Sequence, residues 1–376
     1  MPNDNPFQVH GADPATAARS GVLRTSHGDI RTPAFMPVGT QATVKTLSPA
    51  ELRELGAEII LGNTYHLFIR PGAAIVRAAG GLHRFMAWDG PILTDSGGYQ
   101  VFSLAKLRTI TPEGVRFQSH VDGTPLFLGP REAMATQRDL GSDIAMVFDD
   151  CTPYPASRAE AETSLELTLR WASTCREQPR ADGQLVFAIV QGGTHEELRR
   201  RSARELAAMD FDGYALGGLS VGEPQEEMTR IVRRTAPELP AGRPRYLMGV
   251  GAPPQIVDAV AAGIDMFDCV LPTRVARNGS AYTDRGMVQI KAGRFKDDFS
   301  PIDESCDCTT CRTFTKAYVR HLLNVNEILG LRLMTVHNLR YYLTLMARVR
   351  AAIEAGRYDT FRNEFLARYP LPSADT

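Results

Sequence analysis

The feature that most constrains the fold is an alternation of short apolar segments and amphipathic helical patterns between residues 32 and 274. Most apolar segments have the length of a buried strand, and several of the helical patterns begin with Ser, Thr or Pro at a capping position. Eight such repeats predict an α/β fold, a closed parallel (β/α)8 TIM barrel. An open doubly wound sheet is the main alternative, but no G-x-G-x-x-G motif follows the first segment. The expected strands are 32–38, 57–63, 91–96, 142–149, 185–191, 214–220, 245–251 and 266–272.

Segments outside this alternation predict additions to the barrel. Residues 1–31 indicate a small β cap. Residues 115–129 alternate around Asp122-Gly123, which predicts a hairpin in an insertion at about 102–130, after the third strand. Beyond residue 290 the alternation stops and helical patterns dominate. We therefore expect a barrel with its cap and insertion over 1–290, and a largely helical, zinc-binding subdomain packed on it over 291–376.

Charge and hydrophobicity limit the class of protein. The chain is 43% hydrophobic and 23% charged, which is typical of a soluble globular protein, and no apolar run approaches the roughly 20 residues of a membrane span. The first residues lack a signal-peptide pattern, so we expect a cytoplasmic protein. The net charge is −1, yet residues 271–350 hold 13 lysines and arginines against 7 aspartates and glutamates. This basic region fits either contact with phosphates or ordinary solvated helices.

Polar residues recur at the C-terminal ends of the expected strands, where barrel active sites lie. A single aspartate there is usually a cap or turn residue, but several carboxylates and an amide at one barrel mouth indicate a site for a planar, hydrogen-bonding ligand. Paired carboxylates suit glycosyl transfer, in which one attacks the anomeric carbon and the other transfers protons. The sequence leaves open which of Asp95 and Asp268 has which role. The strand-end residues are Asp95, Asp149, Asp150, Gln191, Gly192, Gly193, Gly217, Gly218, Met248, Gly249 and Asp268.

The last expected strand, within "GIDMFDCVLPTR" (263–274), offers two candidate nucleophiles, Asp268 and Cys269. Strand alternation places them on opposite faces. No histidine partner for the thiol is present in the motif, and a cysteine nucleophile needs one. The pattern therefore favours Asp268 facing the substrate and Cys269 in packing.

Three cysteines and one histidine have the spacing of a metal site, C-x-C-x2-C-x25-H. Three thiolates and one imidazole complete a tetrahedral shell for Zn²⁺, and a complete shell indicates a structural ion. The alternative is reduced thiols beside an unrelated helical histidine. Such a cluster also favours a reducing compartment over a disulfide framework. The four residues are Cys306, Cys308, Cys311 and His337.

Two further patterns each leave two interpretations open. Arg274 and Arg277 follow the last strand, where they can hold phosphates or base edges, or pair with surface acids. Phe314, Tyr318 and His321 fall at i, i+4 and i+7, so a helix there would present them on one face. That face suits either a dimer interface or packing onto the barrel.

Six motifs and the metal spacing, in this order, resemble the bacterial queuine tRNA-ribosyltransferases, or tRNA-guanine transglycosylases, over essentially the whole chain. The resemblance implies a pentosyltransferase that exchanges guanine at the wobble position of GUN-anticodon tRNAs (those for Asp, Asn, His and Tyr) for preQ1. It implies a covalent ribosyl-aspartate intermediate, one structural Zn²⁺ per subunit, a place in queuosine biosynthesis and a homodimer. The motifs are "LTDSGGYQVFSL" (93–104), "MVFDDCTPYPA" (146–156), "IVQGG" (189–193), "GGLSVGE" (217–223), "YLMGVG" (246–251), "DMFDCVLPTR" (265–274) and the C-x-C-x2-C…H site.

The resemblance also implies roles for individual residues. Asp268 matches the nucleophile that attacks C1′ of the ribose, and Asp95 matches the general acid/base. The residues implied to bind the base are Ser96, Gly97, Gly98, Tyr99, Asp149, Cys151, Gln191, Gly218, Leu219, Glu223 and Met248. The residues implied to contact tRNA are Gly249, Val250, Gly251, Ala252, Pro253, Pro254, Gln255, Thr273, Arg274, Val275, Ala276 and Arg277. Cys306, Cys308, Cys311 and His337 match the zinc ligands of the family.

Cys151 and Val221 occupy positions where the eukaryotic enzymes, which use queuine, carry other residues. The resemblance therefore implies preQ1 as the incoming base. Two other functions remain open. One is a non-catalytic tRNA-binding subunit of the same fold, against which the retention of Asp268, Asp95 and Asp149 speaks. The other is a barrel nucleoside hydrolase, which would not need the basic C-terminal region.

Overall fold

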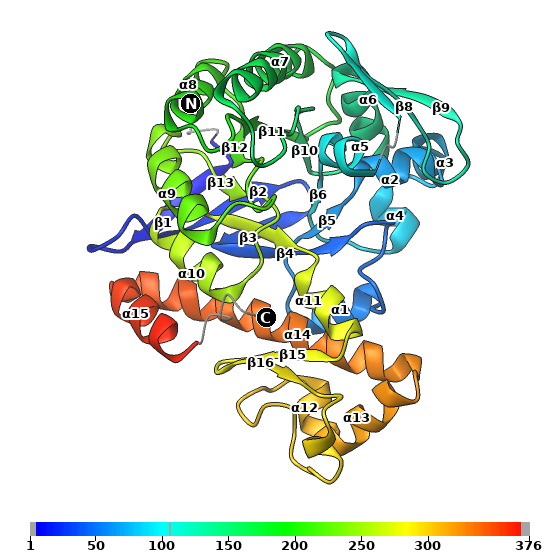
Figure 1. The fold of residues 1–376 in the computed structure, drawn as a ribbon, viewed down its shortest axis with the longest axis vertical. Helices are drawn as coiled ribbons and strands as arrows, with labels where there is room; N and C mark the ends of the chain where they lie inside the picture. Colours follow the sequence, from blue (N-terminus) through cyan, green and yellow to red (C-terminus); the bar gives the residue numbers. More distant parts are fainter. Residues whose placement is uncertain (1–4, 105–106, 370–376) are drawn as a thin grey trace.

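The structure, a computed structural model, describes residues 5–104 and 107–369. Its centre is a closed barrel of eight parallel strands with helices around it (Figure 1). The barrel closes where β10 pairs with β6 and β14 pairs with β4. The predicted (β/α)8 fold is confirmed, and every barrel strand falls at a predicted segment. The strands are β4 (Ala34–Gly39), β5 (Ile60–Gly62), β6 (Ile92–Thr94), β10 (Ile144–Met146), β11 (Leu185–Val190), β12 (Gly213–Leu216), β13 (Arg245–Leu247) and β14 (Met266–Cys269).

Three of the helices that follow barrel strands, α1, α2 and α7, begin at a residue whose side chain caps them. Ser48 and Glu51 form a capping box at α1, and Ser157 and Glu160 form one at α7. The helical patterns expected between the strands are confirmed as helices. The helices between β4 and the end of the barrel are α1 (Pro49–Leu55), α2 (Thr64–Ile69), α3 (Ala73–Ala78), α4 (Leu82–Met86), α5 (Gly98–Leu104), α6 (Pro130–Leu140), α7 (Arg158–Arg176), α8 (Glu196–Ala208), α9 (Gln225–Thr235), the 3-10 turn Ala236–Glu238, α10 (Pro253–Ala261) and α11 (Leu271–Arg277).

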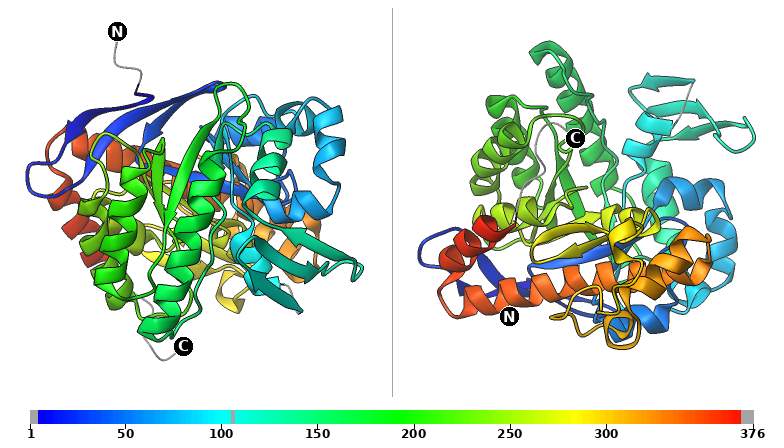
Figure 2. Two further views of the ribbon diagram at one scale, coloured as in Figure 1. Left: turned by 90° about the horizontal axis from the view of Figure 1, so that it is seen from above. Right: turned by 60° about the horizontal axis from the view of Figure 1, so that its bottom comes forward.

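Two three-stranded antiparallel sheets of the described chain lie outside the barrel. The N-terminal cap consists of β1 (Phe7–Ala12), β2 (Arg19–Thr25) and β3 (Gly28–Thr32). The predicted hairpin is confirmed as β8 (Gly114–Gln118) paired with β9 (Pro125–Leu128). A further strand, β7 (Arg108–Thr111), extends it into a sheet at the periphery of the barrel (Figure 2).

The C-terminal part packs on the barrel through one long helix, α14 (Ile328–Glu354), which crosses below the barrel (Figures 1 and 2). Its Asn338 donates to the carbonyls of Pro272 and Ser280, each at 3.0 Å, and its Tyr342 hydroxyl donates to the carbonyl of Gly251. The helix therefore holds the loops that follow β13 and β14. The other elements are β15 (Ser280–Thr283), β16 (Gly286–Gln289), the 3-10 turn Gly293–Phe295, α12 (Thr309–Thr313), α13 (Lys316–Asn324) and α15 (Tyr358–Arg368).

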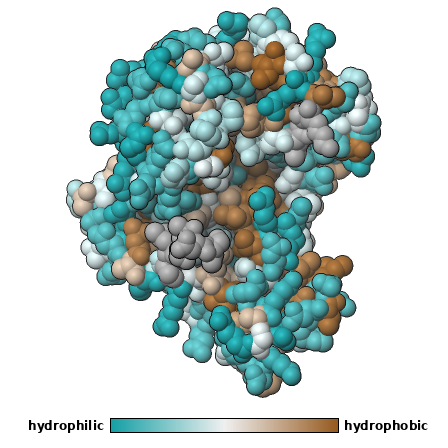
Figure 3. All heavy atoms as spheres, viewed as in Figure 1, coloured by the Kyte–Doolittle hydropathy of each residue, from teal (hydrophilic) through white to brown (hydrophobic). Residues whose placement is uncertain are grey.

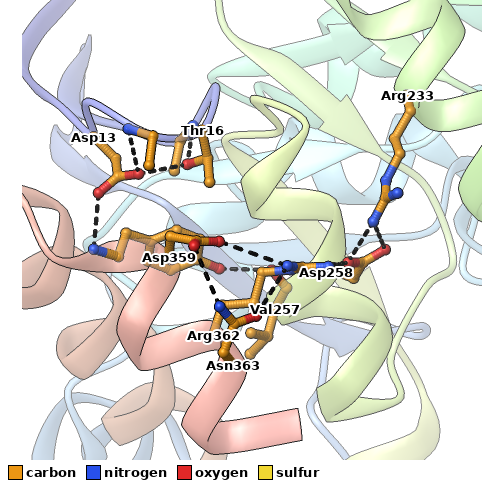
Figure 4. Close-up of polar contacts among 11 residues, drawn as sticks. Asp13, Thr16, Arg233, Val257, Asp258, Asp359, Arg362 and Asn363 are labelled. Carbon is orange, nitrogen blue, oxygen red and sulfur yellow. Dashed lines mark hydrogen bonds and ion pairs between the residues drawn. The ribbon is translucent and has the colours of Figure 1, made fainter.

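The terminal helix α15 is fastened to α10 by polar contacts (Figure 4). Arg362 of α15 and Arg233 of α9 both donate to Asp258 of α10, at 2.9 Å. The backbone N–H of Tyr358 donates to Asp13 at 2.8 Å, which connects the helix to the N-terminal cap. These contacts fix the end of the described chain against the barrel.

The expected Phe314–Tyr318–His321 helix face needs correction. Helix α13 begins at Lys316 because Thr315 caps it, so Phe314 lies outside the helix, although its ring stacks on Tyr318 with centroids 5.5 Å apart. Tyr318 and His321 are exposed to solvent and do not pack onto the barrel. Figure 3 shows hydrophobic side chains gathered where α13 ends and α14 begins. Among the described residues, no helix combines the length and apolar character needed to cross a membrane.

Candidate active site and metal centre

The Asp268 carboxylate is held at one of its two oxygens. Its Oδ1 accepts hydrogen bonds from the Tyr246 hydroxyl at 2.6 Å and from the Gly249 backbone N–H at 2.8 Å. No donor from the described residues reaches Oδ2, and the side chain is half-buried at the end of β14. Burial raises the pKa of Asp268, while the two hydrogen bonds lower it. An oriented carboxylate with one free oxygen at a barrel mouth is suited to nucleophilic attack.

Cys269, the alternative nucleophile, packs against the loop after β13. A Cβ added at Gly251 would lie 2.6 Å from the Cys269 sulfur, so the two residues are in close contact. Burial raises the pKa of the Cys269 thiol to about 12, with a further contribution from the Asp268 charge. A neutral, buried thiol is a poor nucleophile, so the preference for Asp268 agrees with the geometry.

Asp95, directly after β6, is buried at the start of α2. Its Oδ1 accepts the Thr64 backbone N–H at 2.8 Å, and its Oδ2 accepts the Asn63 amide. Burial raises the pKa of Asp95 to about 7, and the charges of Asp268 and Asp149 add to the shift. A carboxyl with this pKa exchanges a proton readily near neutral pH, as general acid–base catalysis requires.

Asp149, after β10, faces two donors that fix both of its oxygens. Ser96 donates to Oδ1 at 2.7 Å, and the Gln191 amide donates to Oδ2 at 2.8 Å. Burial raises the pKa of Asp149 to about 6. The Gln191 Oε1 atom is buried without a hydrogen-bond partner among the described residues. A buried acceptor of this kind is costly unless a ligand supplies the donor.

Gly218 brings its backbone against the same glutamine. It has a left-handed φ of +60°, and a Cβ there would lie 2.3 Å from the Gln191 Oε1 atom. Only glycine both adopts this φ readily and leaves the space that the Gln191 Oε1 atom occupies. The loop that follows is held by Glu223, which accepts the backbone N–H of Val221 at 3.0 Å and that of Ser220.

Arg199, which was not predicted as a site residue, also shapes this region. Its guanidinium is fully buried and donates to the carbonyls of Gly193 and Gly217, each at 2.7 Å, of Val190 at 2.8 Å and of Gly218 at 3.2 Å. One side chain thus joins the loops after β11 and β12. In "EELRRRSAREL" it is one of several arginines, but its spacing to the buried Ser202 and Leu206 was a signal that it faces inward. Tyr246, Asn63 and Thr64 were missed as well.

The other expected base-contacting residues differ in their exposure. Tyr99 on α5 is exposed, so its ring is accessible at the mouth. Met248 is half-buried, whereas Cys151 and Leu219 are buried. Gly97 has a left-handed φ of +81°, and a Cβ at Gly98 would meet the Asp149 carbonyl at 2.5 Å.

The two expected tRNA-contacting segments lie beside Asp268, in the loop from β13 into α10 and in α11. Gly249 and Arg274 are exposed, and no acidic side chain among the described residues forms an ion pair with Arg274. Arg277 is half-buried and donates to the Thr273 carbonyl at 2.8 Å. The remaining side chains face inward or are partly covered: Val250, Gly251, Pro253, Pro254, Thr273 and Ala276 are buried, and Ala252, Gln255 and Val275 are half-buried.

The predicted metal ligands come together in the C-terminal part. One ligand atom each from Cys306, Cys308, Cys311 and His337 lies within 4.8 Å of the others. The His337 Nε2 atom lies 2.8 Å from the Tyr282 carbonyl oxygen, so Nε2 carries the hydrogen and Nδ1 faces the cysteines. Because the donor set is Cys3His and largely buried, the residues fit a metal ion such as Zn²⁺.

Comparison with known proteins finds relatives that match nearly the whole chain. Residues 13–371 match the sequence model of a family described as queuine tRNA-ribosyltransferase. Relatives of that name are 56% identical over 363 residues in Pelotomaculum thermopropionicum (96% of this chain, 98% of the relative) and 58% identical over 363 residues in Moorella thermoacetica (96% and 97%). A third, from Thiobacillus denitrificans, is 58% identical over 357 residues (95% and 96%).

Proposed function

The chain belongs to the queuine tRNA-ribosyltransferase family, and from that premise we propose that it exchanges guanine at the wobble position of GUN-anticodon tRNAs for preQ1. As a member of the family it is a pentosyltransferase that acts on tRNA. The observation that carries the finer proposal is the pairing of Asp268, with one free oxygen, and Asp95, whose pKa is about 7. We place the reaction in the cytoplasm because its substrate is tRNA.

In the first half-reaction, the Asp268 Oδ2 atom bonds to C1′ of the ribose as the bond from C1′ to the guanine nitrogen breaks. The bonding pair leaves with guanine, and protonated Asp95 donates its proton to the departing base. Tyr246 and Gly249 hold the other oxygen of Asp268, so the attacking oxygen stays oriented. The product is a ribosyl-aspartate ester and free guanine.

In the second half-reaction, ionised Asp95 takes a proton from the ring nitrogen of preQ1. That nitrogen attacks C1′ and releases the Asp268 carboxylate, so the enzyme returns to its starting state with net retention. One glycosidic bond replaces another, and the exchange therefore needs no energy-rich cofactor.

Both bases are recognised, in this proposal, by hydrogen bonding at Asp149, Gln191 and the Gly218 backbone. The support is the unpartnered Gln191 Oε1 atom, which lies beside the Asp149 carboxylate and next to Gly218. A base with N–H donors on its edge would satisfy that acceptor. Tyr99 and Met248 would contact the two faces of the base, and Ser96, Gly97, Gly98, Cys151, Leu219 and Glu223 would shape the pocket.

The anticodon loop would bind along the segments 249–255 and 273–277. Exposed Arg274 and the exposed backbone at Gly249 would contact the nucleotides beside the reacting base, while the buried members support the loops. The wobble base must swing out of its stack to reach the barrel mouth, which costs a few kcal/mol and less in a loop than in a duplex.

We propose Zn²⁺ as the ion of the Cys3His site, one per chain. Cys306, Cys308, Cys311 and His337 would complete its coordination, so the ion supplies folding stability and not chemistry. It would link the α12 region to α14, which in turn holds the loops after β13 and β14.

A homodimer is also proposed, formed over the hydrophobic surface where α13 meets α14. Tyr318, Val325, Ile328 and Leu329 are 40–74% exposed there, a large apolar area for a lone chain. Ile328→Asp should shift the molar mass measured by light scattering from two chains to one. Ile110→Asp, at an exposed isoleucine of β7, should leave a dimer; a mass of one chain for the unaltered protein would contradict the proposal.

The central test follows labelled preQ1 into a GUN-anticodon tRNA and measures the guanine released. We expect one guanine released per preQ1 incorporated, and no reaction with free guanosine. Release of guanine without incorporation would indicate a nucleoside hydrolase. Unimpaired tRNA binding without any exchange would indicate a non-catalytic tRNA-binding subunit.

A further inference from the structure

A single buried cation organises the loops beside the base-recognition residues. Arg199 lies in the first turn of α8, and its side chain is fully buried. Four of the five N–H donors of its guanidinium are used, and all four go to backbone carbonyl oxygens. Two of these oxygens belong to Gly217 and Gly218, directly after β12. No carboxylate among the described residues forms an ion pair with this guanidinium, so its charge acts on peptide groups.

The Arg199 side chain keeps its charge at neutral pH. Burial lowers the pKa of Arg199 to about 10, which still leaves the guanidinium protonated near pH 7. A buried charge without an ionic partner is costly unless polar groups surround it. The four carbonyl dipoles are those groups, and each of them is in turn polarised by the cation.

The bonds from Arg199 also fix the direction of a neighbouring backbone N–H. In a trans peptide the C=O and N–H bonds point in opposite directions, and the peptide between Gly217 and Gly218 is trans. The Gly217 carbonyl accepts from Arg199 Nη1 at 2.7 Å, so the Gly218 N–H points away from the guanidinium. No described residue accepts a hydrogen bond from that N–H, and Gly218 is only half-buried. The N–H is therefore a donor available to a ligand.

Two acceptors lie close to this donor. The Gln191 Oε1 atom is buried without a partner among the described residues, and a Cβ at Gly218 would lie 2.3 Å from it. The Gln191 amide in turn donates to Asp149 at 2.8 Å, which places carboxylate oxygens next to it. The edge of guanine presents one acceptor, O6, beside N–H donors, and preQ1 has the same edge. One donor next to two acceptors complements that edge, with O6 as the atom that takes the donor.

We propose that Arg199 is a positioning residue that directs the Gly218 N–H at O6 of the base and strengthens it as a donor. The inference rests on the proposed base exchange and extends it, because Arg199 acts through a peptide group and does not touch the base. A cation at the carbonyl end of a peptide polarises the group, so its N–H end donates more strongly. The charge of Arg199 therefore contributes to the preference for bases with a 6-oxo group.

The test compares guanine with 6-thioguanine, in which sulfur, a weaker acceptor, replaces O6 while the N–H groups remain. Incorporation of labelled guanine into a GUN-anticodon tRNA gives the KM for guanine, and competition by 6-thioguanine gives its inhibition constant. The ratio of the two constants reports the contact at the 6-position. One hydrogen bond of ordinary strength should make this ratio about threefold to tenfold in favour of guanine in the unaltered chain.

Two substitutions separate the charge of Arg199 from its place in the packing. Arg199→Gln keeps an amide donor without the charge, and it should raise the KM for guanine by about threefold to tenfold while changing the inhibition constant of 6-thioguanine little. Arg199→Lys keeps the charge and should keep most of the preference for guanine. Arg204→Gln, at an exposed arginine of α8 that pairs with Glu238, is the matched control and should change neither constant.

Binding of tRNA, measured by gel shift, shows whether each variant is folded and should be equal in all four chains. A purely structural role of Arg199 would raise both constants together and leave their ratio unchanged in both variants, and that result would overturn the proposal. Constants that do not change in Arg199→Gln would overturn it as well. An unaltered chain that incorporates no guanine would instead contradict the proposed function.

A structure of the unaltered chain with guanine bound decides the matter if Arg199→Gln fails to bind tRNA. The proposal expects O6 within hydrogen-bond distance of the Gly218 nitrogen, with the Gly217 carbonyl still on Arg199. A guanine whose O6 accepts from a different donor would overturn it.

Discussion

Replacing Tyr246 by Phe tests how the proposed nucleophile is held, because it removes one of the two hydrogen bonds to Asp268 and little else. The Tyr246 hydroxyl donates to Asp268 Oδ1 at 2.6 Å, and Gly249 supplies the second donor. Phe keeps the buried ring, so the packing of β13 is retained. The lost bond stabilises the ionised form of Asp268, and its removal therefore raises the pKa of that carboxyl further.

A hydrogen bond to a charged group contributes about 1.5–3 kcal/mol, and one pKa unit corresponds to about 1.4 kcal/mol. Tyr246→Phe should therefore raise the pKa of Asp268 by about one to two units. Since the attacking carboxylate must be ionised, the acid limb of the kcat–pH profile should move to higher pH by the same amount. Below that limb, kcat should fall by about tenfold or more.

The assay is incorporation of labelled guanine into tRNA between pH 5 and 9, roughly two units to each side of the Asp95 pKa of about 7. The matched control is Tyr214→Phe, at a buried tyrosine of β12 whose hydroxyl accepts the Phe211 N–H at 3.1 Å, and its profile should match that of the unaltered enzyme. An unshifted acid limb in Tyr246→Phe would refute the assignment of that limb to Asp268 and the role of Tyr246 in holding it.

Three further predictions test the acid–base residue, the base pocket and the metal centre. The folded chain retains the Asp95 proton up to about pH 7, whereas the unfolded chain loses it near pH 4, so the free energy of unfolding falls as pH rises between these values. Asp95→Asn should remove up to about 4 kcal/mol of this loss, so its unfolding temperature should gain on that of the unaltered chain as pH rises. A difference in unfolding temperature between the two chains that is no larger at pH 8 than at pH 4 would contradict this. Gly218→Ala should raise the KM for guanine by about tenfold or more, because the added Cβ would clash with Gln191. The control Gly123→Ala has a similar φ of +77° and no atom within 4 Å of the added Cβ, so its KM should not change. Equal KM values for the two variants would exclude Gly218 from the base-binding site. Cys308→Ser should lose metal and fold together, judged by elemental analysis and circular dichroism, and a folded, fully active, metal-free variant would exclude a structural ion.

The barrel could be predicted because each of its strands and helices is specified by residues that are neighbours in the sequence. Each strand is a short apolar run, buried on both faces, between turn residues and a capped helix, so the pattern alone fixes both the element and its position. The Cys3His cluster could be predicted for a related reason: thiols close in sequence have few other uses in a reducing compartment. The convergence of the carboxylates at the C-terminal ends of β6, β10 and β14 followed from the barrel, since its strand ends lie around one mouth.

What the sequence could not supply depends on contacts between distant segments. Tyr246 lies in the strand beside β14, and Asn63 directly follows the strand beside β6. They hold the carboxylates of Asp268 and Asp95, and no local pattern in the sequence marks them. The buried Arg199 resembles its solvated neighbours until its inward spacing is considered. The start of α13 was missed because the Thr315 cap decides it, which leaves Phe314 outside the predicted helix face.

The most direct test of the central claim is detection of the covalent intermediate. The enzyme is mixed with a GUN-anticodon tRNA in the presence of a slowly reacting base, denatured, and separated on a gel that resolves protein-linked tRNA from free tRNA. The account predicts a protein–tRNA adduct for the unaltered chain and for Cys269→Ser, and none for Asp268→Asn. An adduct that persists in Asp268→Asn, or that disappears in Cys269→Ser while Asp268 is intact, would contradict it.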